Sequence, residues 1–448
     1  MSSGSNLVKV AVCQMTATPD SKSNLEQGRM LIEESKRQRA QIAFLPEGFD
    51  NINRSRAESV EAAQSVSGPT ISEYCAIAKA NNMWLSLGGF KEKSDVSKVY
   101  NTHLIVDPDG NIAGAYRKMH LFDVDIPDKV RLCESDYTLA GNEISKVVAT
   151  PAGNIGLSTC YDLRFPELSA LLRNDGADIL TYPSAFTIPT GKAHWEVLLR
   201  ARAIENQCYV VAAAQVGAHH DKRASYGHSM IVDPWGKVLC EIKDGIGVAT
   251  ADIDLQQLQQ TRESLPVDKH KRRDVYRLDK LGAAELHNID DVPQYMFAQY
   301  PISSKVVFCK TNLSFAFVNR KPVVPGHVLV SPLRVCKRFH DLTTAETSDL
   351  FEVVKKVGDA VTAEFGADSL TISIQDGPDA GQTVEHVHVH ILPRKKGDFE
   401  NNDDIYKKLA THDKQNEGIS TADNSIFRAE EVMAREATSM RKYFHKDQ

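Results

Sequence analysis

Over residues 7 to about 254, short apolar runs alternate with longer amphipathic segments. Short apolar runs bounded by turn residues are typical of strands, and apolar residues at 3.6 spacing are typical of helices. The predicted strands lie at 7–15, 41–47, 83–90, 101–107, 154–160, 177–186, 209–217 and 228–236, and the predicted helices at 23–40 and 193–207. This alternation predicts a layered α/β domain. DPDG at 107–110 and DPWG at 233–236 have the composition of hairpin turns, so we expect a mixed sheet.

The chain is longer than one hydrophobic core usually serves. It has 448 residues, and its periodicity fades into a polar, charged stretch at 255–296. Further apolar runs follow, together with an amphipathic segment at 343–366 that is typical of a helix. We therefore predict a first domain over 1–285 and a compact α+β domain over 286–448.

The composition excludes several classes of protein. With 42% hydrophobic and 25% charged residues, the chain resembles an ordinary globular protein. Its formal charge of -6 argues against binding to nucleic acid or to anionic membrane surfaces. No apolar run reaches the ~20 residues of a membrane span. The eight cysteines form no CxxC pair, so neither a zinc site nor a disulfide framework is expected, and we predict a cytoplasmic protein without nucleic-acid or membrane partners.

One cysteine stands at a predicted corner between a strand and a helix. Cys160 ends the apolar run NIGLSTC, and a helix is expected to begin near Pro166. The positive end of that helix is expected to lower the pKa of the thiol and to enrich the nucleophilic thiolate. The alternative is a buried, inert cysteine, which is how we interpret the other seven.

Two charged residues follow other predicted strands. Glu47 comes after QIAFLP and Lys118 after NIAGAYR, at strand ends where α/β domains usually build their sites. With Cys160 they would supply a base, a cation and a nucleophile, which acyl transfer from an amide or nitrile requires. A cysteine–histidine pair is the alternative, with His120 or His194 as the histidine.

The segment HVHVHILP, at 386–393, places a histidine at every second position. On a strand, His386, His388 and His390 would form a polar face, with the aliphatic residues between them on the core face. Zinc binding is one interpretation, but no Cys or acidic residue stands nearby at ligand spacing. A solvated strand face is another, although such faces more often carry Thr, Lys or Glu. We favour chemistry on a phosphate, because a neutral imidazole is a good nucleophile and the upstream DGPDAGQTV could hold phosphate oxygens.

Three motifs in the first half occur together in a known family. FLPEGF, YRKMHLFD and CYDLRFPEL resemble, in this order, the nitrilase superfamily of carbon-nitrogen hydrolases over residues 7 to about 280. The resemblance implies an αββα sandwich with Glu47 as general base, Lys118 stabilising the tetrahedral intermediate and Cys160 forming a thioester. Glu134 matches an additional glutamate of such sites. The motifs are most similar to those of Nit-type amidases, which implies deaminated glutathione as the small amide substrate.

The second half resembles the histidine triad (HIT) proteins of the Fhit branch. The likeness covers about 300–448 and includes FAFVNRKPVVPGHVLVSPLR and DIYKKLATHDK. It implies hydrolysis of dinucleoside polyphosphates, typically diadenosine triphosphate to AMP and ADP, with the AMP adduct on His388. The implied supporting and nucleotide-binding residues are Asn319, His327, Gln375, Gln382, Thr383, His386 and His390. A divalent cation, Mg or Mn, would accompany the nucleotide, with no protein-held metal and no organic cofactor.

The order of the two halves resembles fusions of a nitrilase domain with a Fhit-type HIT domain. The expected fold is therefore an αββα-sandwich nitrilase domain followed by an α+β HIT domain. The resemblance also implies a homotetramer built on the nitrilase domain. A function of another class stays open, namely a nucleotide-bound signalling module on a scaffold that binds amide metabolites.

Overall fold

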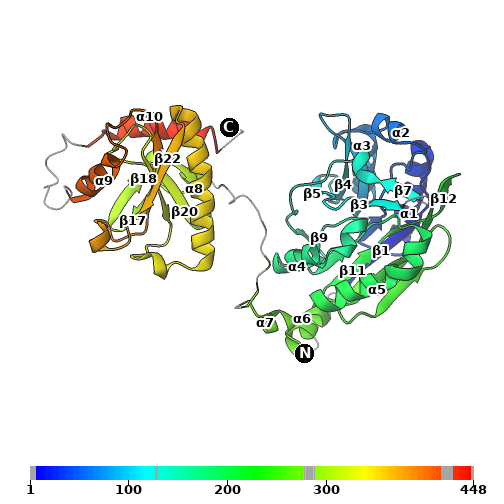
Figure 1. Ribbon diagram of the computed structural model, residues 1–448. Coiled ribbons are helices and arrows are strands. Elements are labelled where there is room, and N and C mark those ends of the chain that lie inside the picture. The colour runs from blue at the N-terminus through cyan, green and yellow to red at the C-terminus, as the bar shows by residue number, and fades with distance from the viewer. Residues whose placement is uncertain are drawn as a thin grey trace. The chain divides into compact units, whose positions relative to one another are not determined.

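The chain forms two compact units in the computed structural model, over 1–280 and 281–448 (Figure 1). The structure describes residues 7–126, 130–273, 275, 276, 278, 286, 288–414 and 427–444. The predicted boundary, between residues 285 and 286, adjoins the stretch 279–285, which lies outside the described residues, and it stays a prediction.

The first unit contains two stacked β-sheets. In the eight-stranded sheet the order is β13 (Arg223–Tyr226), β12 (Ala214–His220), β1 (Val8–Met15), β2 (Ile42–Leu45), β3 (Trp84–Lys93), β4 (Val99–Val106) and β5 (Ile112–Arg117), with β16 (Gly247–Ile253) antiparallel to β1. In the six-stranded sheet the order is β15 (Val238–Ile242), β14 (Ser229–Val232), β11 (Tyr209–Ala212), β10 (Ile179–Thr181), β9 (Gly153–Gly156) and β8 (Val148–Thr150). Parallel and antiparallel pairs occur in both, which confirms the predicted mixed sheet.

Helices cover the outer faces of both sheets (Figure 1). The helices of the first unit are α1 (Ser21–Arg37), α2 (Arg56–Glu61), α3 (Pro69–Asn81), α4 (Pro166–Asn174), α5 (Ile188–Asn206), α6 (Leu255–Ser264) and α7 (Val267–His270). Helix α1 begins after Asp20, whose carboxylate accepts the N–H groups of the first turn. Helices α1 and α3 pack on the eight-stranded sheet, and α4 and α5 pack on the six-stranded sheet. The unit is therefore the expected αββα sandwich.

Alternation along β1 separates the two sides of this sandwich. Val10 and Val12 belong to the core shared with the six-stranded sheet, for example with Ile179. Cys13 and Met15 instead pack with the residues of α1 and α3. Since successive side chains of a strand point to opposite faces, the consecutive apolar residues 10–13 are what a sheet covered on both sides requires.

Some predicted elements differ from the structure. The single strand predicted at 209–217 is two strands, β11 in one sheet and β12 in the other, and the chain crosses between the sheets at Ala213. Helix α3 was not predicted. The DPDG and DPWG turns do join the antiparallel pairs β4–β5 and β14–β15, as predicted.

The second unit is built on a five-stranded antiparallel sheet. The strand order is β19 (Val307–Lys310), β20 (Ser314–Val318), β21 (Val328–Pro332), β23 (Val389–Arg394) and β22 (Ser369–Ile374). Helices α8 (Thr344–Phe365) and α10 (Glu430–Arg441) pack on one face, and α9 (Asp404–Lys414) lies between β23 and α10 in the chain. The Thr343–Glu346 capping box begins α8, and Gly366 ends it in the left-handed conformation. Neither α8 nor any other helix among the described residues is long and apolar enough to cross a bilayer.

The histidine segment differs from its prediction in one respect. Strand β23 begins only at Val389, so His386 and His388 precede it. The aliphatic residues between the histidines do lie in the core beneath α8, as predicted. All three histidines are buried as well. Phe297, in the hairpin of β17 (Gln294–Phe297) and β18 (Tyr300–Ser303), packs against His386 and His388, and His327 lies against His390. The predicted division between an aliphatic core side and a histidine side is therefore confirmed, whereas the burial of the imidazoles was not predicted.

Candidate active sites

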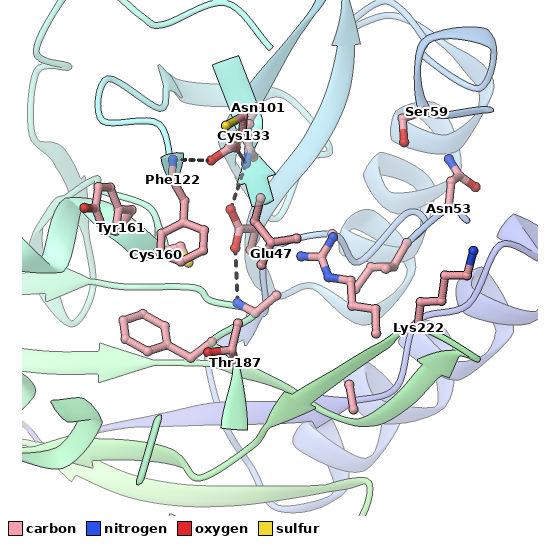
Figure 2. Close-up of a pocket in the computed structure, with 18 of the residues that line it drawn as sticks. Glu47, Asn53, Ser59, Asn101, Phe122, Cys133, Cys160, Tyr161, Thr187 and Lys222 are labelled. Atoms are coloured by element: carbon pink, nitrogen blue, oxygen red, sulfur yellow. Dashed lines mark hydrogen bonds between the residues drawn. The ribbon is translucent and has the colours of Figure 1, made fainter. Parts of the chain in front are cut away.

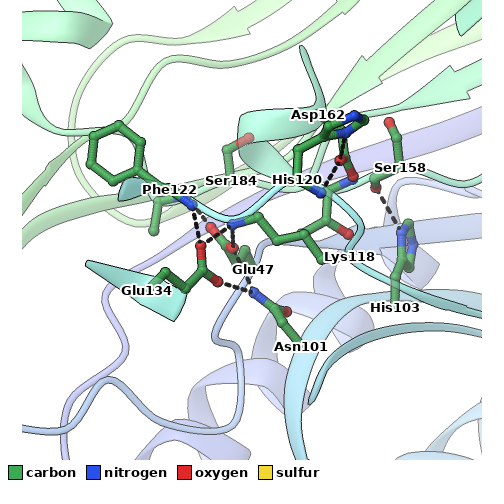
Figure 3. A network of polar contacts seen from close by, with 12 residues as sticks. Glu47, Asn101, His103, Lys118, His120, Phe122, Glu134, Ser158, Asp162 and Ser184 are labelled. Atoms are coloured by element: carbon green, nitrogen blue, oxygen red, sulfur yellow. Dashed lines mark hydrogen bonds and ion pairs between the residues drawn. The ribbon is translucent and has the colours of Figure 1, made fainter. Parts of the chain in front are cut away.

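Loops after three strands bring Glu47, Lys118 and Cys160 together in the first unit. Glu47 follows β2, Lys118 follows β5, and Cys160 begins a 3-10 turn, Cys160–Arg164, after β9. Glu47 and Cys160 both line one pocket (Figure 2). The Lys118 ammonium donates to Glu47 Oε1 at 3.1 Å (Figure 3), and the Cys160 thiol interacts with the Glu47 carboxylate. All three side chains are buried. The structure thus brings together the three side chains that were predicted as base, cation and nucleophile.

The backbone at Cys160 is held in an unusual conformation. Its φ is 50°, in the left-handed region that residues with a Cβ rarely adopt. The Cys160 N–H donates to the Pro183 carbonyl at 2.9 Å, and the Thr159 N–H donates to Asp162 Oδ2 at 2.8 Å. Strain of this kind persists only where the surroundings impose it, and it is common at active sites.

The protonation of Cys160 differs from the prediction. Burial and the adjacent Glu47 carboxylate raise the pKa of the thiol above its usual value, so the predicted thiolate enrichment is wrong. The physical reason is that α4 begins only at Pro166, beyond the 3-10 turn, whereas Glu47 touches the thiol. Burial alone would raise the pKa of Glu47, but Lys118 and Cys160 outweigh it and hold that pKa at about 2. The resting site is therefore a thiol beside a carboxylate that can accept its proton.

Glu134 and Asn101 complete the polar network. Glu134 Oε2 accepts from Lys118 at 2.8 Å and from the Phe122 N–H at 2.9 Å (Figure 3). Asn101, on β4, donates to Glu47 Oε1 at 2.8 Å and to Glu134 Oε1 at 3.3 Å. Burial favours the neutral amine of Lys118, but the two carboxylates outweigh it and raise its pKa well above the usual range. Sequence reasoning missed Asn101, because a neutral amide within a strand carries no signal of a catalytic role.

The alternative pair of cysteine with histidine is not favoured by this geometry. His120 Nδ1 lies 2.7 Å from Asp162 Oδ1, and its ring stacks on Phe165. His194 contacts Arg164 instead, with 3.2 Å between the two nitrogens. Glu47 is the group that contacts the Cys160 thiol.

A cavity of about 710 Å³ opens at these residues (Figure 2). Its lining includes Glu47, Lys118, Glu134 and Cys160, together with apolar surface such as Phe186. This volume lies within the usual range for small-molecule sites. A small peptide-like amide could therefore reach the thiol.

The second unit brings His327 to the three histidines of the 386–390 segment. His327 Nε2 and His390 Nδ1 are 3.0 Å apart, and the rings of His388 and His390 have centroids 4.9 Å apart. His388 Nδ1 lies 2.7 Å from the His386 carbonyl oxygen. Because a carbonyl can only accept, Nδ1 carries the proton and Nε2 of the neutral ring keeps its lone pair. Nε2 is therefore the His388 nitrogen whose lone pair is not used by this contact.

The β17–β18 hairpin contributes to this site, although sequence reasoning gave it no role. The Ala298 N–H, at the hairpin turn, donates to His386 Nδ1 at 3.0 Å. The Phe297 ring packs against both His386 and His388. Burial, and to a smaller extent His388, lowers the pKa of His386 to about 4. His386 is therefore neutral at physiological pH.

The predicted nucleotide-binding residues are placed in two groups. Asn319 contacts His327, with 3.3 Å between Nδ2 and Nε2, and so joins the histidines. Gln382 accepts from the Gly377 N–H and donates to the Lys337 carbonyl, which holds its own loop. Thr383 follows in that loop, and Gln375 directly follows β22. Within the part of the chain that the structure describes, no three His, Cys, Asp or Glu side chains form a group able to hold a metal ion.

Comparisons with known proteins agree with the two folds. The carbon-nitrogen hydrolase family matches residues 9–263, and the HIT domain family matches 301–397. The chain is 49% identical over 434 residues to the nitrilase and fragile histidine triad fusion protein NitFhit of Caenorhabditis elegans, with 96% of each covered. The chain belongs to the NitFhit family. The crystal structure of the C. elegans NitFhit protein superposes with a TM-score of 0.82 at 46% identity, over 98% of this chain and 99% of that one.

A second relative matches the first unit alone. The human deaminated glutathione amidase is 52% identical over 279 residues, which is 61% of this chain and 85% of that protein. The comparisons confirm the predicted order of a nitrilase-superfamily domain followed by a HIT domain. The NitFhit layout thus joins two hydrolase-type domains in one chain.

Proposed function

We propose that the chain is a bifunctional hydrolase whose first unit cleaves a small amide and whose second unit cleaves dinucleoside polyphosphates. The observation that carries the first activity is the contact of the Cys160 thiol with Glu47, beside the charged Lys118. The observation that carries the second is the orientation of His388, which leaves Nε2 as the nucleophile.

The amidase reaction follows from these contacts. Glu47 takes the thiol proton while Cys160 Sγ attacks the carbonyl carbon, and the Lys118 ammonium stabilises the developing oxyanion. Glu47 then gives the proton to the departing amine, which leaves a thioester on Cys160. Water, deprotonated by Glu47, hydrolyses the thioester and regenerates the thiol. Glu134 positions Lys118 throughout, through the 2.8 Å ion pair.

The proposed amide is deaminated glutathione. Support comes from the human relative with that named activity and from a cavity of suitable volume. Wild type and Cys160→Ala are to be incubated with this compound, quenched and examined by mass spectrometry. We expect an acyl adduct on Cys160 and no turnover in the variant, with Cys240→Ala as the control. Full turnover in Cys160→Ala would overturn the amidase proposal.

The second reaction uses His388 as a covalent nucleophile. Nε2 attacks the α-phosphorus of diadenosine triphosphate, ADP leaves, and AMP stays on the imidazole until water releases it. The flanking histidines orient the ring and protonate the leaving group. We propose that Mg or Mn arrives bound to the phosphates of the nucleotide.

A quench experiment tests this second reaction. Protein stopped during turnover of diadenosine triphosphate should carry AMP on His388, and His388→Ala should show neither adduct nor product. His340→Ala is the matched control, because His340 is an exposed histidine of the same unit. An adduct on another residue, or full activity in His388→Ala, would reject the mechanism.

A further inference from the structure

The amidase cavity holds more positive charge than its own carboxylates neutralise. Among the described residues, its lining contains seven lysines and arginines but only two acidic side chains, Glu47 and Glu134. Both of these pair with the buried Lys118. The remaining cations must therefore find partners outside the lining, or none.

The six remaining cations divide into three with a partner and three without. Arg56 pairs with Asp136, Lys91 lies 3.6 Å from Asp50, and Arg164 contacts His194. In contrast, the side chains of three exposed lining residues form no ion pair or hydrogen bond with any residue that the structure describes. These residues are Arg54, Lys222 and Arg223.

Arg223 is fixed in the fold and close to the reacting groups. It begins β13, where its backbone pairs with His220 of β12. Its charge lowers the pKa of Glu47 and also acts on Tyr137, although it is hydrogen-bonded to neither. A guanidinium that lines the same cavity as Glu47, is carried by a hairpin and has no counterion among the described residues is suited to bind a planar anion there.

We propose that Arg223 binds a carboxylate of the amide substrate, with Arg54 and Lys222 adding to the positive field of the cavity. This inference rests on the proposed amidase function and narrows it: the site selects amides that carry a second, anionic group. Several positive charges in one cleft also concentrate the electric field there, which raises the local concentration of anionic substrates. Arg223 would thus set specificity, while Glu47, Lys118 and Cys160 perform the chemistry.

The test compares deaminated glutathione with its fully methyl-esterified form, which has the same amide without the carboxylates. In Arg223→Gln, we expect kcat/KM for the acid to fall about 10- to 100-fold, mainly through KM, as one charge-assisted contact is lost. For the ester we expect a change below about threefold. Arg223→Lys should recover part of the loss. Lys192→Gln is the control, because it removes one exposed charge of α5 outside the cavity lining.

The ester separates binding from an indirect effect on the base. If Arg223 acted only by lowering the pKa of Glu47, both substrates would lose kcat equally in Arg223→Gln. An equal loss, or no loss for the acid, would overturn the carboxylate assignment.

A binding experiment decides the inference even if neither compound is hydrolysed, an outcome that would reject the amidase proposal alone. The rate of Cys160 alkylation by iodoacetamide is measured in each variant with and without glutarate. We expect glutarate to protect Cys160 in wild type and in Lys192→Gln, and Arg223→Gln to need at least about tenfold more glutarate. Equal protection in all three proteins would contradict the assignment of Arg223 to an anion-binding subsite.

Discussion

Cys160 is placed beside the group proposed as its base, but its thiol is not ionised at rest. Its thiol is protonated at rest, because burial and the Glu47 carboxylate both oppose the thiolate. In the proposed mechanism, the nucleophile forms only when Glu47 takes the proton during attack. Such coupling keeps a reactive thiolate from standing in an accessible cavity between turnovers.

Replacing Glu47 should separate thiol acidity from catalysis. Glu47→Gln removes a negative charge from the thiol and leaves Lys118 beside it, so the pKa of Cys160 should fall. Iodoacetamide alkylation should therefore reach half its maximal rate at a lower pH than in wild type. Amidase kcat should nevertheless drop by several orders of magnitude, as should that of Lys118→Ala, because these groups act as a unit. Glu73→Gln, at an exposed position on α3, is the control. A kcat loss below about tenfold in Glu47→Gln would contradict the role of Glu47 as base and favour a cysteine–histidine pair.

Asn101 gives a second prediction at this scale. Its amide bridges Glu47 and Glu134 without adding charge. Asn101→Asp would place a third carboxylate beside a single ammonium, and this repulsion should raise the pKa of at least one of them. We expect amidase kcat to fall and the acid limb of its pH profile to move to higher pH, whereas Asn101→Ala should lower kcat without that pH shift. Identical profiles in both variants would contradict the positioning role.

At the scale of elements, the β17–β18 hairpin controls the environment of the histidines. It buries His386 and supplies the Ala298 N–H that fixes one ring nitrogen. The pKa of His386 therefore lies at about 4, below the value of about 6.5 in an unfolded chain. Since the unfolded state binds the proton more readily, the stability that His386 contributes is present above pH 6.5 and is lost as the pH falls towards 4.

Histidine NMR resonances provide the measurement for this element. In wild type, the His386 signal, assigned by its loss in His386→Asn, should titrate near pH 4. Phe297→Leu, which shortens the side chain that covers His386, should admit water and raise the pKa of His386. The exposed His340 is the reference signal in these spectra. Titration of wild-type His386 near pH 6.5 would show that the hairpin does not seal the site.

The same scale shows where sequence reasoning succeeds and where it ends. The strand ends that carry Glu47, Lys118 and Cys160 could be predicted, because short apolar runs mark the strands and each of these residues stands at or just after the end of one. The sheet change at Ala213 could not be predicted, since the apolar run continues unbroken through this position, from residue 209 to residue 214. The raised pKa of Cys160 and the burial of His386 were also out of reach. Both depend on side chains brought from distant parts of the chain, Glu47 and Phe297.

For the whole molecule, the two active sites should be chemically separable. The amidase network draws its residues from the first unit and the histidine site from the second. Cys160→Ala should leave diadenosine triphosphate hydrolysis within about twofold of wild type, and His388→Ala should spare the amidase equally. Both activities are to be assayed in both variants. If one folded variant silences the other site, the two reactions are coupled.

Assembly is the property through which the units could influence each other. We propose a homotetramer built on the nitrilase unit. Light scattering after size-exclusion chromatography would measure the mass of wild type, Cys160→Ala and His388→Ala. Equal masses would allow their activities to be compared directly.

The crossing of the chain at Ala213 has a mechanical consequence. Glu47 and Lys118 extend from the eight-stranded sheet, whereas Cys160 extends from the six-stranded one, so the reacting pair spans the interval between two slabs. At Ala213 the backbone itself ties these slabs, and the Gln215 N–H adds a 2.9 Å bond to the Ser184 carbonyl beside the tie. The distance between the Cys160 thiol and the Glu47 carboxylate, across which we propose that the proton moves, therefore depends on the spacing of the two sheets. Hydrostatic pressure reduces the gaps between packed sheets. We therefore expect pressure to change the amidase turnover rate before any strand unfolds.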